Sequence, residues 1–157
     1  MPPALALGTN RCVGALGEFS AILQYRRQNR LDYRRLLLGF GVVLLSASAG
    51  ALTVQFLHPK FVEKLIPFAL LLILIYLVLP KKNHRRARAR LSDPVFFVIF
   101  GGLIGFYNGF LGPGTGTFWV AALLAFLAFE LKDAIIYAKP LNLAGNLFSI
   151  VWFVVLG

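Results

Sequence analysis

The chain alternates long apolar stretches with short, strongly basic ones. Residues 36–57 contain no charged side chain and are long enough for a helix to cross about 30 Å of hydrocarbon. A second stretch, from about residue 61 or 65 to residue 79, consists almost entirely of Leu, Ile, Phe and Val, and Pro80 followed by Lys81 marks its end. We expect two membrane-spanning helices, the second facing lipid over much of its surface.

Within the first of these helices, residues 46–51 are small on every face. Small side chains let the backbone of a neighbouring helix approach closely, which helix contacts in membranes favour. We therefore expect this run to serve packing rather than binding.

Two further helices are expected at about residues 4–25 and 133–156, and both carry polar side chains in apolar surroundings. The first contains Asn10, Arg11 and Glu18. Charged groups at membrane depth normally face the interior of a bundle or a wet cavity, which predicts an interior helix. In the last helix a polar stripe recurs at helical spacing and consists of Lys139, Asn142, Asn146 and Ser149.

Residues 94–129 are apolar but are interrupted by the glycine-rich segment 105–116. Irregular backbone survives in hydrocarbon only where it is buried in protein or lines a polar cavity. The arms of about 16 and about 13 residues on either side would reach roughly 24 Å and 20 Å, too short for two comfortable crossings. The pattern predicts a re-entrant helical hairpin or two half-helices that meet within the membrane.

The composition excludes a water-soluble protein, because 59% of the residues are hydrophobic, 14% are charged and the mean hydropathy is +0.77. The net charge of +10 arises largely from residues 26–35 and 81–90, two short loops between apolar spans. Basic loops of this kind stay on the cytoplasmic side, so both should be cytoplasmic and residues 57–60 should lie outside. The charge therefore indicates orientation in a lipid bilayer, with no nucleic-acid partner.

Residues for catalysis, metal binding or redox chemistry are missing from the pattern. Cys12 is the single cysteine, and the two histidines lie beside loops without a carboxylate or thiol at ligand spacing. The glycine-rich segment contains no serine, and the apolar spans contain no histidine and no pair of aspartates. We expect no cofactor, no metal and no enzymatic activity.

A faint internal repeat relates the first and last helices. Residues 6–23 can be laid over residues 134–151, which matches Arg11 with Lys139 and places Glu18 over Asn146. If residues 94–129 return to the side on which they start, these two helices run in opposite directions, as in an inverted repeat.

The repeat predicts a division of the chain into three parts. Residues 1–80 would be the C-terminal part of a first repeat and residues 81–93 a basic cytoplasmic loop. Residues 94–157 would then be the N-terminal part of a second repeat. The fold class is an all-helical, polytopic transmembrane bundle with incomplete inverted-repeat halves.

Three motifs resemble the sulfite/taurine exporter family (TauE/SafE) of membrane permeases. They are Gly-Phe-Tyr-Asn-Gly-Phe-Leu-Gly-Pro-Gly-Thr-Gly-Thr-Phe at 105–118, Ala-Leu-Gly-Thr-Asn-Arg at 6–11, and Ala-Lys-Pro-Leu-Asn at 138–142 followed by Asn146. The resemblance implies a secondary carrier with two related halves that moves small sulfur-containing anions across the bacterial inner membrane. Family members usually have an aspartate where this chain has Asn108, and they extend beyond both ends of it, so we expect a fragment. Assembly into a homo-oligomer stays open.

The glycine-rich break and the family motifs together suggest a substrate site. Free N–H groups and the positive end of the helix dipole at such a break favour an anion, which Lys139 could neutralise and the amides could orient. The candidate substrate-binding residues are Tyr107, Asn108, Gly109, Gly112, Pro113, Gly114, Thr115, Gly116, Asn10, Arg11, Lys139, Asn142 and Asn146.

Several alternatives stay open. The glycine-rich segment could be a packing notch, Lys139 could pair with a carboxylate, and the amides could bind neighbouring backbone. Arg11 and Glu18 could form a structural pair or stand on opposite sides of a permeation path, and we do not expect Glu18 to carry protons. The alternative function is a truncated, transport-inactive membrane subunit.

Overall fold

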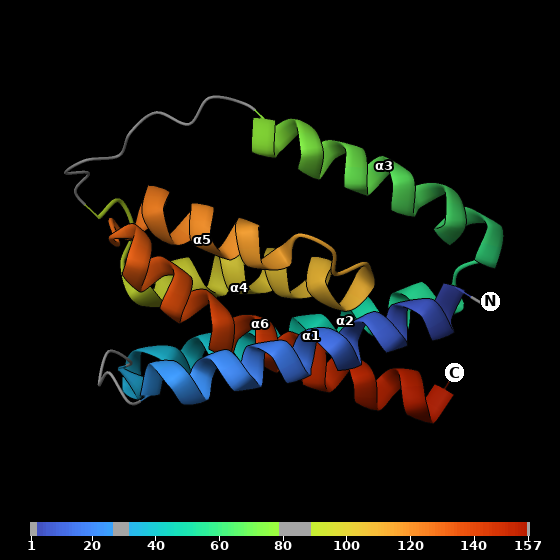
Figure 1. Ribbon diagram of the computed structural model, residues 1–157, viewed down its shortest axis with the longest axis horizontal. Helices are drawn as coiled ribbons and strands as arrows, with labels where there is room; N and C mark the ends of the chain where they lie inside the picture. Colours follow the sequence, from blue (N-terminus) through green and yellow to red (C-terminus); the bar gives the residue numbers. More distant parts are fainter. Residues whose placement is uncertain (1–2, 27–31, 79–88, 157) are drawn as a thin grey trace.

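A computed structural model describes residues 3–26, 32–78 and 89–156 of the chain. It contains six helices in these residues and no strand (Figure 1). They are α1 (Pro3–Arg26), α2 (Tyr33–Phe56), α3 (Pro59–Val78), α4 (Asp93–Phe110), α5 (Thr115–Phe126) and α6 (Leu131–Leu156). Helices α2, α4 and α6 are long and apolar enough to cross a membrane. The protein is thus a polytopic helical membrane protein, as the sequence predicts.

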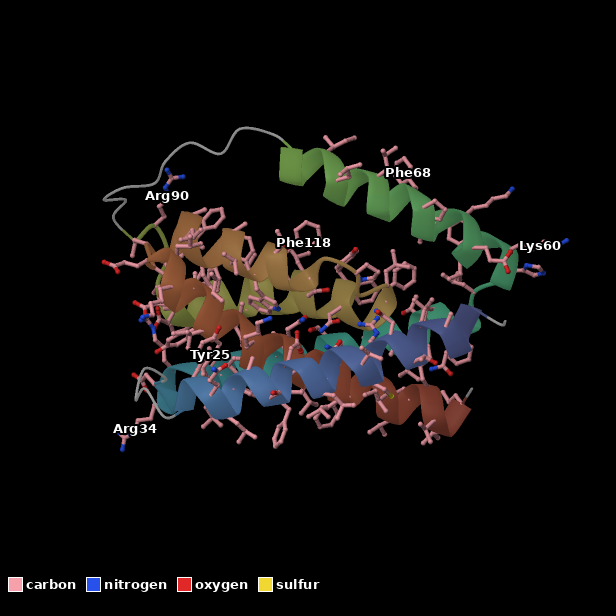
Figure 2. The ribbon with its side chains drawn as sticks, viewed as in Figure 1. Tyr25, Arg34, Lys60, Phe68, Arg90 and Phe118 are labelled. Carbon is pink, nitrogen blue, oxygen red and sulfur yellow. The ribbon has the colours of Figure 1, made fainter. Side chains whose placement is uncertain are left out.

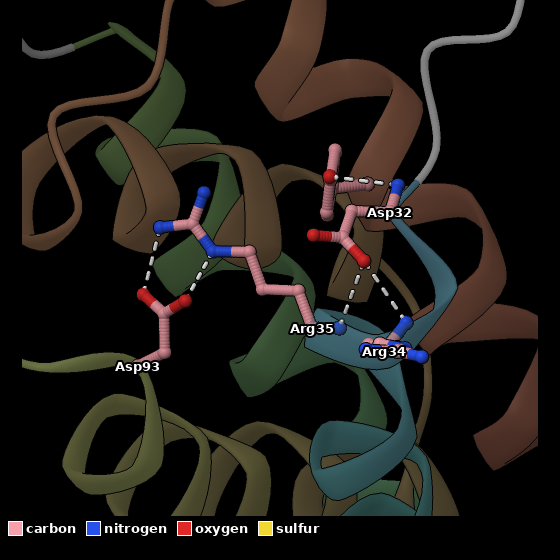
Figure 3. Close-up of polar contacts among 5 residues, drawn as sticks. Asp32, Arg34, Arg35 and Asp93 are labelled. Carbon is pink, nitrogen blue, oxygen red and sulfur yellow. Dashed lines mark hydrogen bonds and ion pairs between the residues drawn. The ribbon is translucent and has the colours of Figure 1, made fainter.

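Each predicted helix is present, with small shifts at the ends. Helix α2 begins before residue 36 because Asp32 caps it, accepting hydrogen bonds from the backbone N–H of Arg34 at 3.0 Å and of Arg35 at 3.3 Å (Figure 3). Helix α3 begins at Pro59, since proline suits a first helical turn in which N–H groups lack partners. The predicted stop at Pro80 and most of the two basic loops lie outside the described residues.

Helices α2 and α4 pack with their backbones in contact. A Cβ atom on Gly109 would overlap the carbonyl oxygen of Ala47, and one on Gly50 would overlap the carbonyl oxygen of Phe106. The Ser46 hydroxyl donates a hydrogen bond across the same contact to the carbonyl of Gly101 at 2.9 Å. The packing role expected for residues 46–51 is confirmed.

The predicted break in the apolar region 94–129 is also confirmed. Helix α4 ends at Phe110, α5 starts at Thr115, and α5 runs back along α4 (Figure 1). The hairpin turns back before it reaches the end of the bundle to which α1, α2 and α6 extend (Figure 1). Its apolar side chains pack on α6 and α2 in a core that includes Phe96, Phe97, Trp119, Leu123 and Leu141.

Helices α1 and α6 lie side by side and run in opposite directions (Figure 1). This is the arrangement expected for the two helices that the repeat relates, although the repeat and the division at residues 81–93 stay predictions. Helix α1 is interior on its polar face only. Arg11 and Glu18 are buried, whereas Val13, Leu16 and Phe19 are exposed on the other face, where a membrane protein presents apolar side chains to lipid.

Helix α3 stands apart from the packed helices over most of its length (Figure 1). Near its start Val62 is buried in a small cluster with residues of α1, α2 and α6. Further along, Phe68, Leu71 and Leu74 are exposed, and Figure 2 shows Phe68 on α3 away from the bundle. The expectation of a largely lipid-facing helix agrees with this arrangement.

Candidate functional site

The break between α4 and α5 is a tight turn fixed by two glycines. Gly112 has a φ of 90° and Gly114 a φ of 76°, and both values lie in the left-handed region that L side chains rarely adopt. The Tyr107 hydroxyl donates a hydrogen bond to the carbonyl of Pro113 at 2.7 Å, and the buried Thr115 hydroxyl donates one to the carbonyl of Gly112. The turn is therefore held by side chains of the two helices that it joins. We call residues 109–114 the hairpin tip.

Arg11 of α1 supports the hairpin tip through hydrogen bonds to the end of α4. Its side chain is 1% exposed and donates one hydrogen bond to Asn108 Oδ1 at 2.5 Å and another to the carbonyl of Gly109 at 3.1 Å. A Cβ atom on Gly112 would overlap the guanidinium group, so this glycine also makes room for the arginine. A buried arginine that hydrogen-bonds both a side chain and a backbone carbonyl at the end of α4 fixes the position of the tip.

A closed network of side-chain hydrogen bonds joins α1, α4 and α6. Arg11 donates to Asn108 and, at 3.4 Å, to Asn146. Asn108 Nδ2 donates at 3.2 Å to Asn142 Oδ1, Asn142 Nδ2 donates to Glu18, and Asn146 Nδ2 donates to Glu18 at 3.0 Å. Arginine only donates hydrogen bonds and an ionised carboxylate only accepts them. Each amide between Arg11 and Glu18 therefore turns its oxygen toward the Arg11 side and its nitrogen toward the Glu18 side. We call these five residues the amide network.

Next to the amide network lies a cleft of about 360 Å³ between α1, α5 and α6. Its polar lining consists of Glu18, Gly114, Gly116, Thr117 and Lys139, and apolar side chains of α5 and α6 complete it. Lys139 is half-buried and close enough to Glu18 to attract it electrostatically, yet it makes no hydrogen bond or ion pair within the described residues. The lysine is thus available to a solute in the cleft.

The start of α5 borders the same cleft, which Gly114 and Gly116 line. Gly114 is the N-cap of α5 and no side chain caps the helix there. The N–H groups of Thr115, Thr117 and Phe118 have carbonyl partners within the turn, whereas those of Gly114 and Gly116 have none among the described residues. Helix N-termini with free N–H groups are sites where proteins bind anions.

The structure brings together most of the residues singled out from the sequence, in two layers. Arg11, Asn108 and Asn146 are buried behind the cleft, while Gly114, Gly116 and Lys139 line it. The others belong to the hairpin tip or border the two layers: Tyr107, Gly109, Gly112, Pro113, Thr115 and Asn142.

Two residues lie differently from what the polar pattern suggests. Asn10 is exposed on α1, outside the amide network. Ser149, the end of the polar stripe, is buried and donates its hydrogen bond to the carbonyl of Gly145 in its own helix at 2.6 Å. Neither residue lines the cleft.

The contacts of Arg11, Glu18 and the amides distinguish some of the alternatives that the sequence leaves open. Arg11 and Glu18 do not pair directly within the described residues but are joined through Asn146. Asn142 and Asn146 donate to the Glu18 carboxylate rather than to neighbouring backbone.

Sequence reasoning named Glu18 without placing it in the site. One signal could have found it, namely its position two helical turns after Arg11 on the same face. In the part of the chain that the structure describes, no group of His, Cys, Asp and Glu side chains could hold a metal ion.

A helical membrane bundle with a broken hairpin, a buried polar network and a cleft beside the break has the architecture of a membrane transporter. The family model described as Sulfite exporter TauE/SafE matches residues 1–157. The chain belongs to this family. No solved structure matches it.

Named relatives agree with this class. The chain is 35% identical to a "Probable membrane transporter protein" of Haemophilus influenzae, over all of the chain and 62% of that protein. It is 30% identical to the "Probable membrane transporter protein YfcA" of Escherichia coli K12, over all of the chain and 59% of that protein. It is 32% identical to the "Probable membrane transporter protein ORF9" of Sinorhizobium sp, over 93% of the chain and 56% of that protein. The chain thus spans about 60% of the length of the first two relatives.

Proposed function

We propose that this chain carries the anion-binding part of a secondary transporter for small sulfur-containing anions, such as sulfite or sulfonates, in a bacterial inner membrane. The family supports transport, and its description supports sulfite as the first solute to test. The observation that carries the anionic nature of the solute is the cleft beside the hairpin tip. There, Lys139, Thr117, Gly114 and Gly116 border one space, and the N–H groups of the two glycines have no partner among the described residues.

These donors suit an oxyanion for simple physical reasons. The two N–H groups sit at the positive end of the α5 dipole, and the ammonium of Lys139 supplies a full charge on the facing helix. Charge-assisted hydrogen bonds of this kind are shorter and stronger than those between neutral groups. A sulfite or sulfonate group offers several acceptor oxygens, enough for the donors of both helices.

Lys139 gives the sharpest test. We expect Lys139→Ala to weaken sulfite binding by about tenfold or more, because a hydrogen bond to a charged group contributes about 1.5–3 kcal/mol. Binding would be measured by calorimetry on the detergent-solubilised chain, and flux by sulfite uptake into proteoliposomes.

Lys132→Ala is the matched control for this experiment. Lys132 is exposed at the start of α6 and does not line the cleft, so its loss removes the same charge without touching the site. Equal sulfite affinity in Lys139→Ala and the unaltered chain would contradict the proposal. Absence of binding and flux for sulfite, sulfonates and other small anions would favour the alternative, a transport-inactive membrane subunit.

A further inference from the structure

Glu18 is the one acidic residue among those that line the cleft in the described part of the chain. Its side chain is 7% exposed, and the cleft is its path to water. An anion that binds to Lys139 and the start of α5 therefore comes to lie beside a carboxylate. Two negative charges held close together repel each other, and the repulsion favours protonation of the carboxylate.

The groups around Glu18 come from each helix packed on this region. Helix α6 contributes Lys139 and the two asparagines of the amide network, α4 contributes Asn108 behind them, and α5 contributes Thr117 across the cleft. On α1 itself the nearest charge is Arg11, reached through Asn146. The charged groups are thus two cations and Glu18.

This charge balance depends on one proton. With Glu18 ionised, its charge offsets one of the two cations and the site carries a net charge of about +1 before an anion enters. With Glu18 neutral, Arg11 and Lys139 are both unopposed and the attraction for an anion is greater. We propose that Glu18 takes up a proton when an anion binds in the cleft, so that proton and anion occupy the site together.

This inference rests on the proposed function. It also revises our expectation from the sequence that Glu18 carries no proton. The proton comes from the buffered solution through the cleft, binds to a carboxylate oxygen of Glu18 and returns to the solution when the anion leaves. No other bond forms or breaks.

The amide network provides a physical route from this proton to the hairpin tip. Both carboxylate oxygens of Glu18 accept a hydrogen bond, one from Asn142 and one from Asn146. A protonated acid has an O–H donor in place of one of these acceptors, so one amide must turn and present its oxygen.

The turn then propagates along the network. If Asn146 turns, it presents its Nδ2 instead of its Oδ1 to Arg11, and the hydrogen bond from Arg11 to Asn146 is lost. If Asn142 turns, its Nδ2 faces the Nδ2 of Asn108, which then keeps only its bond to the backbone carbonyl of Asn142. Either turn removes a hydrogen bond from Arg11 or from Asn108, and these two residues are part of what fixes the hairpin tip. Protonation of Glu18 therefore loosens the support of the tip.

The test counts protons. Ethanesulfonate is the probe, because a sulfonate keeps its single charge across the working pH range while sulfite does not. Calorimetric titration of the full chain in two buffers of different ionisation enthalpy yields the number of protons taken up per anion bound. We expect about one proton for the unaltered chain above the pH at which Glu18 ionises, and an affinity that falls by up to about tenfold per pH unit there.

Glu18→Gln mimics the neutral acid in shape and hydrogen-bonding capacity, so it should bind ethanesulfonate with no proton uptake and little pH dependence. Glu63→Gln is the matched control, since Glu63 is exposed on α3 and should leave both quantities unchanged. The proton count of the unaltered chain tests the proposal even where Glu18→Gln fails to fold.

The outcomes separate the two proposals. Binding without proton uptake in the unaltered chain, or unchanged proton uptake in Glu18→Gln, overturns the role of Glu18 and leaves the anion site standing. Binding that Lys139→Ala does not weaken overturns the anion site, and the role of Glu18 falls with it.

Discussion

The missing side chain of Gly109 allows α2 and α4 to touch. A Cβ atom there would lie 2.8 Å from the Cα of Ala47 and overlap its carbonyl oxygen, and backbone atoms cannot move aside as a flexible side chain can. We therefore expect Gly109→Ala to push the helices apart and to destabilise the protein by about 1–3 kcal/mol. The unfolding midpoint of the detergent-solubilised protein, followed by circular dichroism, would measure the loss.

Gly102 on the same helix is the matched control for this change. It is half-buried, and a Cβ atom on it would meet nothing within 4 Å. Gly102→Ala should leave the midpoint unchanged or raise it slightly, because alanine favours a helix over glycine by up to about 1 kcal/mol. Equal destabilisation by both changes would contradict a specific contact at Gly109.

Single residues of the site could be predicted from the sequence only where spacing fixes their direction. The i, i+3, i+7 spacing of Lys139, Asn142 and Asn146 placed them on one face, and that face borders the cleft and the network. Asn10 was named with its neighbour Arg11, but successive helical residues point about 100° apart, so one is buried and the other exposed. The hydrogen bonds of Glu18 depend on α6, whose packing against α1 no local pattern specifies.

Arg35 and Asp93 tie the start of α2 to the start of α4. Two nitrogens of the guanidinium group donate to the two carboxylate oxygens, with Nη2 and Oδ1 2.7 Å apart (Figure 3). Both side chains are 34% exposed, so water screens the pair and reduces its contribution. We expect a double-mutant cycle of Arg35→Gln and Asp93→Asn to give a coupling energy of about 1 kcal/mol in unfolding experiments.

Arg34 provides the control for this cycle. It is exposed, and within the described residues its side chain makes no ion pair with Asp93. Arg34→Gln combined with Asp93→Asn should give a coupling energy near zero. A coupling as large as that of Arg35 would show that general surface charge, rather than the paired geometry, joins the two helices.

The helices themselves were largely predictable, because hydrocarbon length and the absence of charge define them. The break was predictable too, since a helix cannot continue through residues with positive φ such as Gly112 and Gly114. The start of α2 was not, because the uncharged stretch begins at residue 36 while the cap of Asp32 extends the helix across two arginines. The exposed face of α1 was missed because two charges dominated the interpretation of an otherwise apolar helix.

At the scale of the whole molecule, the described ends of the helices fall into two groups. The starts of α2, α4 and α6 lie at one end of the bundle, together with the ends of α1 and α5 (Figure 1). The hydrogen bonds of Asp32 N to Tyr137 Oη, and of Arg90 N to the carbonyl of Phe126, join elements at this end. The described residues on both sides of 27–31, and those that follow 79–88, therefore lie at one end of the bundle, as the orientation predicted from charge requires.

This arrangement leads to a labelling experiment on the full chain. Figure 2 shows Arg34 and Arg90 at one end of the bundle and Lys60 at the other, and all three are exposed. We introduce Arg34→Cys, Arg90→Cys or Lys60→Cys singly into a Cys12→Ala background, which contains no other cysteine. If Lys and Arg loops stay cytoplasmic, a membrane-impermeant maleimide should label only the Lys60→Cys protein in intact spheroplasts. The other two should react only after the membrane is permeabilised. Labelling of Arg34→Cys but not Arg90→Cys in intact spheroplasts would place the two basic loops on opposite sides and contradict the bundle in Figure 1.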